Sequence, residues 1–278
     1  RMGALKGFSP AELKPFTPTN GELRTGLSMG AHCERMAREW QISREDQDQL
    51  ACESHLKAAA AYDAGFFDEL VVPWSGVSRD NNLRPDSSVE KLAGLRTAFD
   101  KGPEATLSAG NSTPLTDGAA AVLLCSEEWA KEHDLPVQAY LITGRSASVD
   151  FVNDEGLLMA PTVAVAEMLQ RTGLSLQDFD YYEIHEAFAA QVLCTLKAWE
   201  SEDYCRDRLG LDKPLGSIDR EKLNINGSSL AVGHPFAATG ARIIATLSEI
   251  LTEKGSGRGL ISVCTAGGMG VCAILERP

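Results

Sequence analysis

The chain has 278 residues, 44% of them hydrophobic, and its 26 Lys and Arg against 39 Asp and Glu give a formal net charge of −13. The length favours two domains, and the apolar fraction excludes a chain that is disordered throughout. The acidic balance argues against a nucleic-acid binder, and no stretch reaches the roughly 20 apolar residues of a membrane-spanning helix.

The cysteines and the N-terminal sequence bear on the cellular compartment of the protein. The seven cysteines are odd in number and include no Cys-x-x-Cys pair, which indicates reduced thiols rather than a disulfide framework or a zinc site. No charged segment followed by an apolar one and a small-residue cleavage site marks a signal peptide. We therefore expect a cytoplasmic protein without a metal centre.

The sequence of the first part of the chain predicts helices that do not pack on a sheet of their own. Residues 1–24 are rich in proline and lack periodicity. Ser43, followed three residues later by Asp46, resembles a capping box and introduces an Ala-rich helix over 44–64. We interpret residues 1–104 as a mostly helical, irregular subdomain.

The second part of the chain predicts an α/β domain. Residues 105–135 change character, and 119–126 have the composition of a buried strand. From residue 136 the order βαβαβαββ indicates a layered α/β fold with a mixed five-stranded sheet. The predicted strands are 137–146, 179–184, 223–228, 259–264 and 270–276, and the predicted helices are 161–172, 186–199 and 237–254.

Three corners at the ends of predicted strands carry chemically active side chains. They are His185-Glu186, Gly233-His234-Pro235 and the turn 264–268, which begins at Cys264 and contains Ala266 and Gly267. Open α/β sheets bind ligands beyond the carboxyl ends of their strands, so one cleft can collect all three corners.

Each of these side chains has a functional and a structural interpretation. His234 is a candidate general base or a structural histidine at a helix start. Cys264 is a candidate thiol acid/base, with a turn that offers N–H groups to an oxyanion, or a buried strand cysteine. His185 is a candidate hydrogen-bond donor or part of a helix N-terminal pair with Glu186.

Two further segments leave the same choice open. The loop 108–118, with Ser112 and Thr113, suits a polar ligand or forms an ordinary Asn/Gly turn. Met29 is a candidate for the wall of an acyl pocket or for core packing.

Taken together and in this order, four motifs resemble the thiolase family. They are Ser-Ala-Gly-Asn-Ser-x-Pro-Leu-x-Asp-Gly from Ser108, His-Glu-Ala-Phe-Ala-Ala-Gln from His185, Gly-His-Pro-x-x-Ala-x-Gly-Ala-Arg from Gly233 and Cys-x-Ala-Gly-Gly-x-Gly from Cys264. The likeness is greatest to the 3-ketoacyl-CoA thiolases of fatty-acid β-oxidation, of the type related to the trifunctional-protein β subunit. These have His-Glu-Ala-Phe where many biosynthetic relatives have Asn-Glu-Ala-Phe.

The resemblance implies a thiolase-like layered fold in three parts. Residues 1–104 match the loop domain, 105–135 match the last elements of the N-terminal half, and 136–278 match the C-terminal α/β domain. It also implies an acyltransferase that cleaves a 3-ketoacyl-CoA with free CoA to give acetyl-CoA and a shortened acyl-CoA. CoA is then a substrate, and no cofactor is needed.

The resemblance also implies roles for single residues. His234 matches the histidine that activates the nucleophilic cysteine, and Cys264 matches the cysteine that exchanges a proton with the acetyl-CoA carbanion. His185 and His234 match the groups that stabilise the enolate oxygen. Met29, Ser112, Thr113, Ala266 and Gly267 then lie against CoA or its acyl chain.

One departure from the family shapes the expectation for activity. In the family, the nucleophilic cysteine lies in a part that precedes the loop domain, and this chain begins with the loop domain. We therefore expect the nucleophile on a missing or separate N-terminal part. We also expect the isolated chain to be inactive and to have an exposed apolar face. The alternative is a non-catalytic protein that binds CoA or acyl-CoA; a ketosynthase of related fold fits the motifs less well. Expected partners are a second copy of the chain and a hydratase/dehydrogenase subunit.

Overall fold

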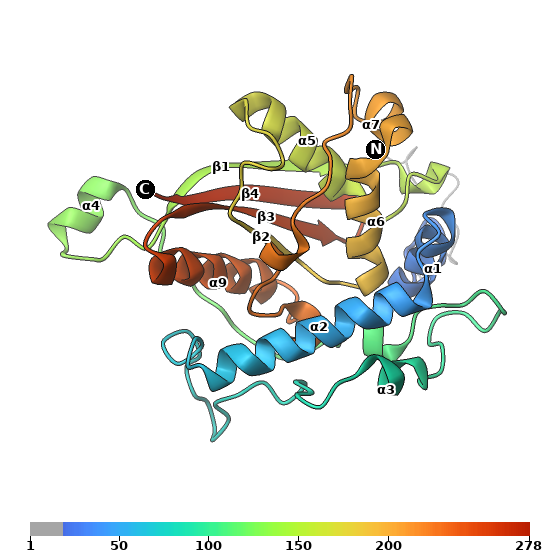
Figure 1. Cartoon of the computed structure of the whole chain (residues 1–278), viewed down its shortest axis with the longest axis horizontal. Coiled ribbons are helices and arrows are strands. Elements are labelled where there is room, and N and C mark those ends of the chain that lie inside the picture. The colour runs from blue at the N-terminus through green and yellow to red at the C-terminus, as the bar shows by residue number, and fades with distance from the viewer. Residues whose placement is uncertain (1–18) are drawn as a thin grey trace, which may run out of the picture.

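The computed structural model describes residues 19–278, so most of the predicted irregular segment 1–24 lies outside the described residues. Helices α1 (Met29–Glu39), α2 (Arg44–Asp63) and α3 (Val89–Ala93) come first in the chain (Figure 1). The predicted helix over 44–64 is confirmed as α2. Its cap differs from a capping box, because Ser43 Oγ accepts from the Asp46 N–H at 3.0 Å and also donates to the Asp46 carboxylate at 2.6 Å.

A four-stranded mixed sheet forms the centre of the second part. Its strands β1 (Tyr140–Ser148), β2 (Tyr181–Ile184), β3 (Gly257–Thr265) and β4 (Met269–Arg277) lie in the order β1-β4-β3-β2. β2 pairs with β3 in parallel, and the other two pairs are antiparallel. The predicted mixed α/β class is confirmed, but the predicted fifth strand over 223–228 is wrong.

The side chain of Asn224 explains why no strand forms there. Its amide accepts from Ile184 N–H at 2.9 Å and donates to Ile184 C=O at 3.0 Å, so it occupies the β2 backbone groups that a continuing strand needs. Only Leu223 makes an isolated bridge to β2. Asn224 and Gly227 then adopt φ values of 44° and 69°, which turn the chain away from the sheet.

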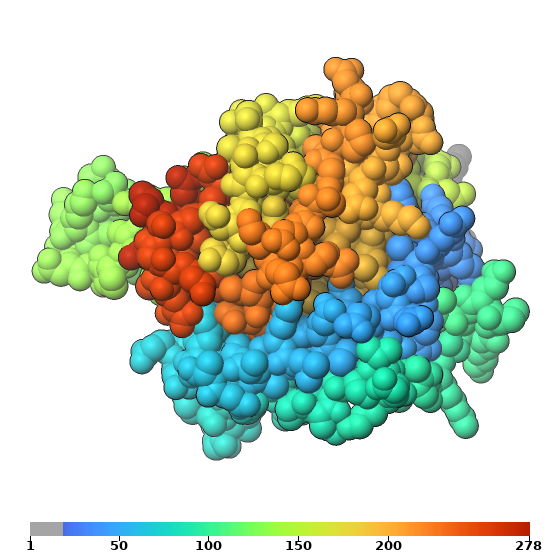
Figure 2. Space-filling model, viewed as in Figure 1, coloured from blue at the N-terminus to red at the C-terminus, as the bar shows by residue number. Residues whose placement is uncertain are grey.

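The segment 119–126 is also not the buried strand that its composition predicts. It has no regular structure, and the side chains of Leu123 and Leu124 are 69% and 64% exposed. An apolar strand is buried only where a neighbouring strand and a covering layer exist, and the described residues provide neither here. The segment leads into α4 (Glu127–Glu132), which projects at one end of the molecule (Figure 2).

Helices cover both faces of the sheet. α5 (Ala160–Thr172) and α6 (Ala189–Glu200) share the largest apolar cluster with one face, through residues such as Val165, Val192 and Ile274. α9 (Ala238–Lys254) packs on the other face through a second cluster that includes Leu247 and Val263. In Figure 1, α5 and α9 lie on opposite sides of the strands, and α2 lies beyond α9. The short helices α7 (Glu202–Asp207) and α8 (Ser229–Val232) complete the domain.

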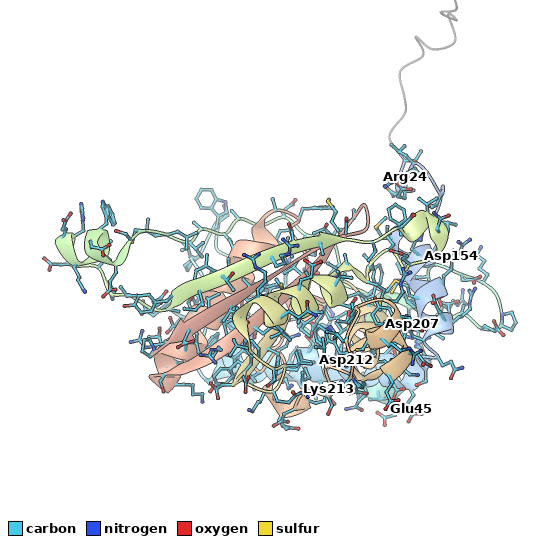
Figure 3. All side chains as sticks on the ribbon, turned by 90° about the horizontal axis from the view of Figure 1, so that it is seen from above. Arg24, Glu45, Asp154, Asp207, Asp212 and Lys213 are labelled. Atoms are coloured by element: carbon cyan, nitrogen blue, oxygen red, sulfur yellow. The ribbon has the colours of Figure 1, made fainter. Side chains whose placement is uncertain are left out.

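Many charged side chains lie on the outside of these layers. The six that are labelled in Figure 3 are all exposed: Arg24, Glu45, Asp154, Asp207, Asp212 and Lys213. Within residues 19–278, no helix combines the length and the apolar character that crossing a membrane requires.

Candidate active site

Two histidines from separate corners of the chain meet beyond the carboxyl end of β2. His185 extends the pairing of β2 with β3 by one residue, because its N–H donates to Ser262 C=O at 2.9 Å. His234 follows α8, and its ring centroid lies 4.5 Å from that of His185, with an angle of 43° between the rings. Cys264 lies near the end of β3, two residues beyond Ser262. The predicted corners therefore gather at one edge of the sheet.

His185 is a buried, neutral imidazole. Its side chain is 1% exposed, and its Nδ1 lies 2.7 Å from Ser229 Oγ. Burial lowers the pKa of His185 well below its usual range, and the neighbouring His234 and Arg242 lower it further. The ring therefore offers one nitrogen as a donor and the other as an acceptor.

His234 is a half-buried imidazole on a rigid corner. Its backbone N–H donates to Pro114 C=O at 2.9 Å, and its Nδ1 lies 2.7 Å from Thr239 Oγ1. The preceding Gly233 has a φ of 94°, and a Cβ there would lie 2.4 Å from Thr116. Burial, with the charge of Arg242, lowers the pKa of His234, so this ring is unprotonated at neutral pH and can accept a proton.

Cys264 is a thiol in an apolar setting. It is 5% exposed and belongs to a cluster with Phe188, against which Met29 packs. Burial raises the pKa of Cys264 to about 12. At neutral pH it is therefore protonated, as a proton donor must be, and is not a standing thiolate. The glycines of the turn that follows, Gly267 and Gly268, have φ values of 78° and 71°.

The loop that carries Ser112 and Thr113 holds the histidine corners in place. Ser112 Oγ donates to Ser108 C=O at 2.7 Å, and Thr113 Oγ1 donates to Ser229 C=O at 2.6 Å. Thr113 N–H donates to Ala187 C=O at 3.1 Å. Both hydroxyl protons are thus used within the protein, and the contacts of these two residues with substrate stay predictions.

The remaining predicted binding residues lie near the same edge. Met29 is half-buried at the start of α1, Gly267 is half-buried and Ala266 is exposed at the tip of the turn between β3 and β4. Their contacts with CoA or an acyl chain stay predictions as well.

Sequence reasoning gave no role to three side chains, two of which contact a histidine directly and one of which acts through Ser229. Ser229 and Thr239 lie against Nδ1 of His185 and His234, and Arg242 donates to Ser229 Oγ at 2.6 Å. The signal was the spacing of Thr239 and Arg242, five and eight residues after His234, which places both on the first turns of one helix.

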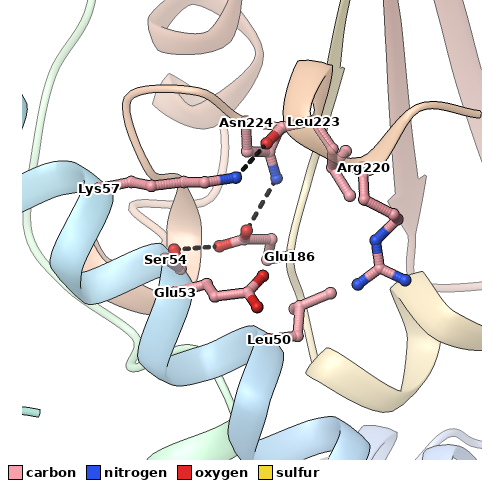
Figure 4. Close-up of a pocket in the computed structure, with 8 residues that line it drawn as sticks. All are labelled: Leu50, Glu53, Ser54, Lys57, Glu186, Arg220, Leu223 and Asn224. Atoms are coloured by element: carbon pink, nitrogen blue, oxygen red, sulfur yellow. Dashed lines mark hydrogen bonds between the residues drawn. The ribbon is translucent and has the colours of Figure 1, made fainter. Parts of the chain in front are cut away.

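The carboxylate of Glu186 is structural. It accepts from Ser54 Oγ at 2.7 Å, Asn224 Nδ2 at 2.8 Å and Leu230 N–H at 3.0 Å. Figure 4 shows it facing α2 across a small pocket, which Lys57 also lines. The volume of about 10 Å³ holds about one water, so this pocket is not a substrate site.

Comparisons with family models and with known sequences point to the same family. The N-terminal domain of thiolases matches residues 17–128, and the C-terminal domain of thiolases matches residues 136–277. A 3-ketoacyl-CoA thiolase of Alteromonas mediterranea is 43% identical over 99% of this chain and 64% of its own length. This chain thus spans a little under two thirds of the length of that relative.

Solved structures agree with the sequence comparison. Human mitochondrial 3-ketoacyl-CoA thiolase in complex with CoA superposes with a TM-score of 0.77 and 30% identity, over 93% of this chain and 61% of that one. The dimeric peroxisomal thiolase of Saccharomyces cerevisiae superposes with a TM-score of 0.76 and 36% identity, over 91% of this chain and 60% of that one.

Proposed function

We propose that this chain, which belongs to the thiolase family, supplies the CoA-binding and proton-transfer side of a 3-ketoacyl-CoA thiolase of fatty-acid β-oxidation. The observation that carries the proposal is the contact between the rings of His185 and His234 at the sheet edge where the Cys264 strand ends. The names of the relatives at 43% identity support the substrate class.

The proposed reaction assigns proton transfer to His234 and Cys264 and hydrogen-bond donation to His185. His234 takes the proton of an acyl-accepting cysteine, whose sulfur attacks the 3-keto carbon. The bond between C2 and C3 breaks, and its electron pair forms the enolate of acetyl-CoA. The Cys264 thiol protonates that carbanion, while His185 donates a hydrogen bond at the enolate oxygen. Free CoA then gives its thiol proton to the Cys264 thiolate and takes the acyl group from the enzyme cysteine, whose sulfur regains its proton from His234.

The acyl-accepting cysteine is proposed to come from a thiolase segment other than the described residues. Six of the seven cysteines here are buried, and Cys125 lies on the exposed segment that precedes α4. Among residues 19–278, none of them hydrogen-bonds to His234. A nucleophile has to reach its base at hydrogen-bond distance.

The proposal extends to partners and location. Assembly with a second copy is supported by the dimeric yeast neighbour, and a hydratase/dehydrogenase subunit is the partner that the substrate class suggests. A cytoplasmic location is supported by seven unpaired thiols, which reducing compartments maintain.

Thiolysis of acetoacetyl-CoA tests the proposal. The purified chain alone is expected to give no turnover, and the chain assembled with the segment that carries the nucleophile is expected to release acetyl-CoA. An assembled protein that binds CoA without thiolysis would instead be a non-catalytic CoA or acyl-CoA binding protein. Turnover by the chain alone would place the nucleophile among its own seven cysteines.

A further inference from the structure

Ser229 connects the ring of His185 to the guanidinium of Arg242. Ser229 is fully buried, and its Oγ lies 2.7 Å from His185 Nδ1 and 2.6 Å from Arg242 Nη2. Neither contact involves the substrate. Because Ser229 opens α8 and Arg242 belongs to α9, two elements outside β2 fix this side of the His185 ring.

The direction of each hydrogen bond follows from the chemistry of the three groups. A guanidinium only donates, so Ser229 Oγ accepts from Arg242. The hydroxyl has a single proton, and among the described residues the one other polar atom within hydrogen-bond distance of Oγ is His185 Nδ1. The hydroxyl therefore donates to Nδ1, and a neutral ring that accepts there carries its proton on Nε2.

The two other protonation states of His185 are less favourable. A proton on Nδ1 would leave the hydroxyl proton of fully buried Ser229 without an acceptor, which costs roughly 1–3 kcal/mol. A doubly protonated ring would place a second cation near Arg242 in a buried site, and burial already lowers the pKa of His185.

Ser229 and Arg242 each make a further contact. Arg242 Nη1 donates to Ser228 Oγ at 3.1 Å, and Thr113 Oγ1 donates to the backbone C=O of Ser229. Burial lowers the pKa of Arg242, and the neighbouring Glu183 and Glu186 oppose this shift; a guanidinium is not deprotonated in proteins. The guanidinium stays charged and keeps donating to Ser229.

We infer that Ser229 and Arg242 are positioning residues, which hold His185 in the tautomer with its proton on Nε2. The Nε2–H is then a permanent hydrogen-bond donor, and a developing enolate oxygen or an ordered water requires such a donor. The tautomer rests on geometry alone, whereas its catalytic use rests on the proposed function.

Nitrogen NMR of the chain with ¹⁵N-labelled histidine tests the tautomer without turnover. The chain has five histidines, and the signals that disappear in a His185→Asn sample identify those of His185. We expect Nδ1 to resonate as an unprotonated, pyridine-type nitrogen and Nε2 as a protonated, pyrrole-type one. The reverse pattern, or two averaged resonances in the parent, would overturn the inference.

Three variants separate positioning from general packing. Ser229→Ala and Arg242→Met are expected to move both His185 resonances toward averaged values, since nothing then fixes the polarity at Nδ1. Ser228→Ala is the matched control, because it removes a hydrogen bond of Arg242 but no contact of the His185 ring, and its resonances should stay those of the parent. Parent-like resonances in Ser229→Ala would contradict the role of Ser229. If either variant fails to fold, the parent spectrum still decides the tautomer, and failed thiolysis with the expected spectrum would refute only the proposed function.

Discussion

The hydroxyl of Ser54 on α2 donates to the carboxylate of Glu186 at 2.7 Å, although 132 positions separate the two residues. Glu186 directly follows His185, so this buried bond fastens the histidine corner to the helical first part of the chain (Figure 4). The same carboxylate accepts from Asn224 and Leu230, and it therefore joins α2, the corner after β2 and the segment that leads to His234.

Glu186→Gln is expected to destabilise the chain by roughly 1–3 kcal/mol. The two carboxylate oxygens accept three hydrogen bonds, and an amide NH₂ in place of either oxygen faces a donor. Chemical denaturation measures the effect. Glu53→Gln is the control, since Glu53 lines the same pocket but accepts only from exposed Gln49. An effect of Glu186→Gln no larger than that of Glu53→Gln would contradict the structural role.

His234→Ala is expected to slow acylation in the assembled enzyme. The variant removes the base for the nucleophile, a loss of roughly 10²–10⁴-fold, and also a donor at the enolate oxygen. Single-turnover kinetics with a 3-ketoacyl-CoA resolve this step. An unchanged acylation rate would leave His234 as a structural histidine at a helix start.

His185→Asn is expected to be the mildest of the site substitutions, with a loss of kcat smaller than that of His234→Ala. The asparagine amide can replace the Nε2–H as a donor, which an alanine cannot do. Steady-state kinetics of His185→Asn and His185→Ala compare the two. Equal losses in both variants would show that donation at this position is unimportant.

The stability of the chain is expected to fall with acidification through His55. Its Nδ1 accepts from the Arg84 N–H at 3.2 Å, and burial, with the charge of Arg84, lowers the pKa of His55 to about 4. Between pH 6.5 and 4 the unfolded chain therefore binds a proton that the folded chain does not, and stability is lost as the pH falls through this window. Buried Glu183, whose pKa is raised to about 8, acts in the opposite sense, because its contribution is lost as the pH rises from 4.5 to 8.

His55→Asn isolates the histidine contribution, because the amide oxygen can still accept from Arg84. Urea unfolding at pH 7 and pH 4.5 should show that the variant loses about 2–3 kcal/mol less than the parent on acidification. An equal loss in both proteins would mean that His55 is protonated in the folded state.

Local patterns were sufficient to predict much of the fold. Periodicity and caps predicted α2, α5 and α9, and two apolar runs on either side of a glycine-rich turn predicted β3 and β4. The error at 223–228 arose because the amide of Asn224 replaces a strand backbone, and composition does not show where a side chain pairs. The error at 119–126 arose because burial depends on neighbours distant in the sequence, and residues 19–278 provide none for this segment.

The site could be predicted only in part for the same reason. His234 and Cys264 stand in turns with glycines or a proline, and His185 directly follows a strand pattern, so their neighbourhood was visible in the sequence. Ser229 stands in no distinctive motif, and Arg242 ends the motif that begins at Gly233, but nothing in that motif indicates its partner. Their contact with His185 depends on how α8 and α9 pack beside β2, which no local pattern contains.

The central claim is that Cys264 moves the proton of the acetyl-CoA carbanion, and exchange of the acetyl-CoA methyl protons with deuterated solvent measures that step. In the assembled enzyme, the parent is expected to exchange these protons and Cys264→Ser to exchange them at least 100-fold more slowly, because a serine hydroxyl is a far weaker acid than the thiol. Cys272→Ser, which changes a buried cysteine on β4, should exchange as the parent does. Exchange in Cys264→Ser as fast as in the parent, or no exchange in the parent, would contradict the account and leave Cys264 as a packed strand cysteine.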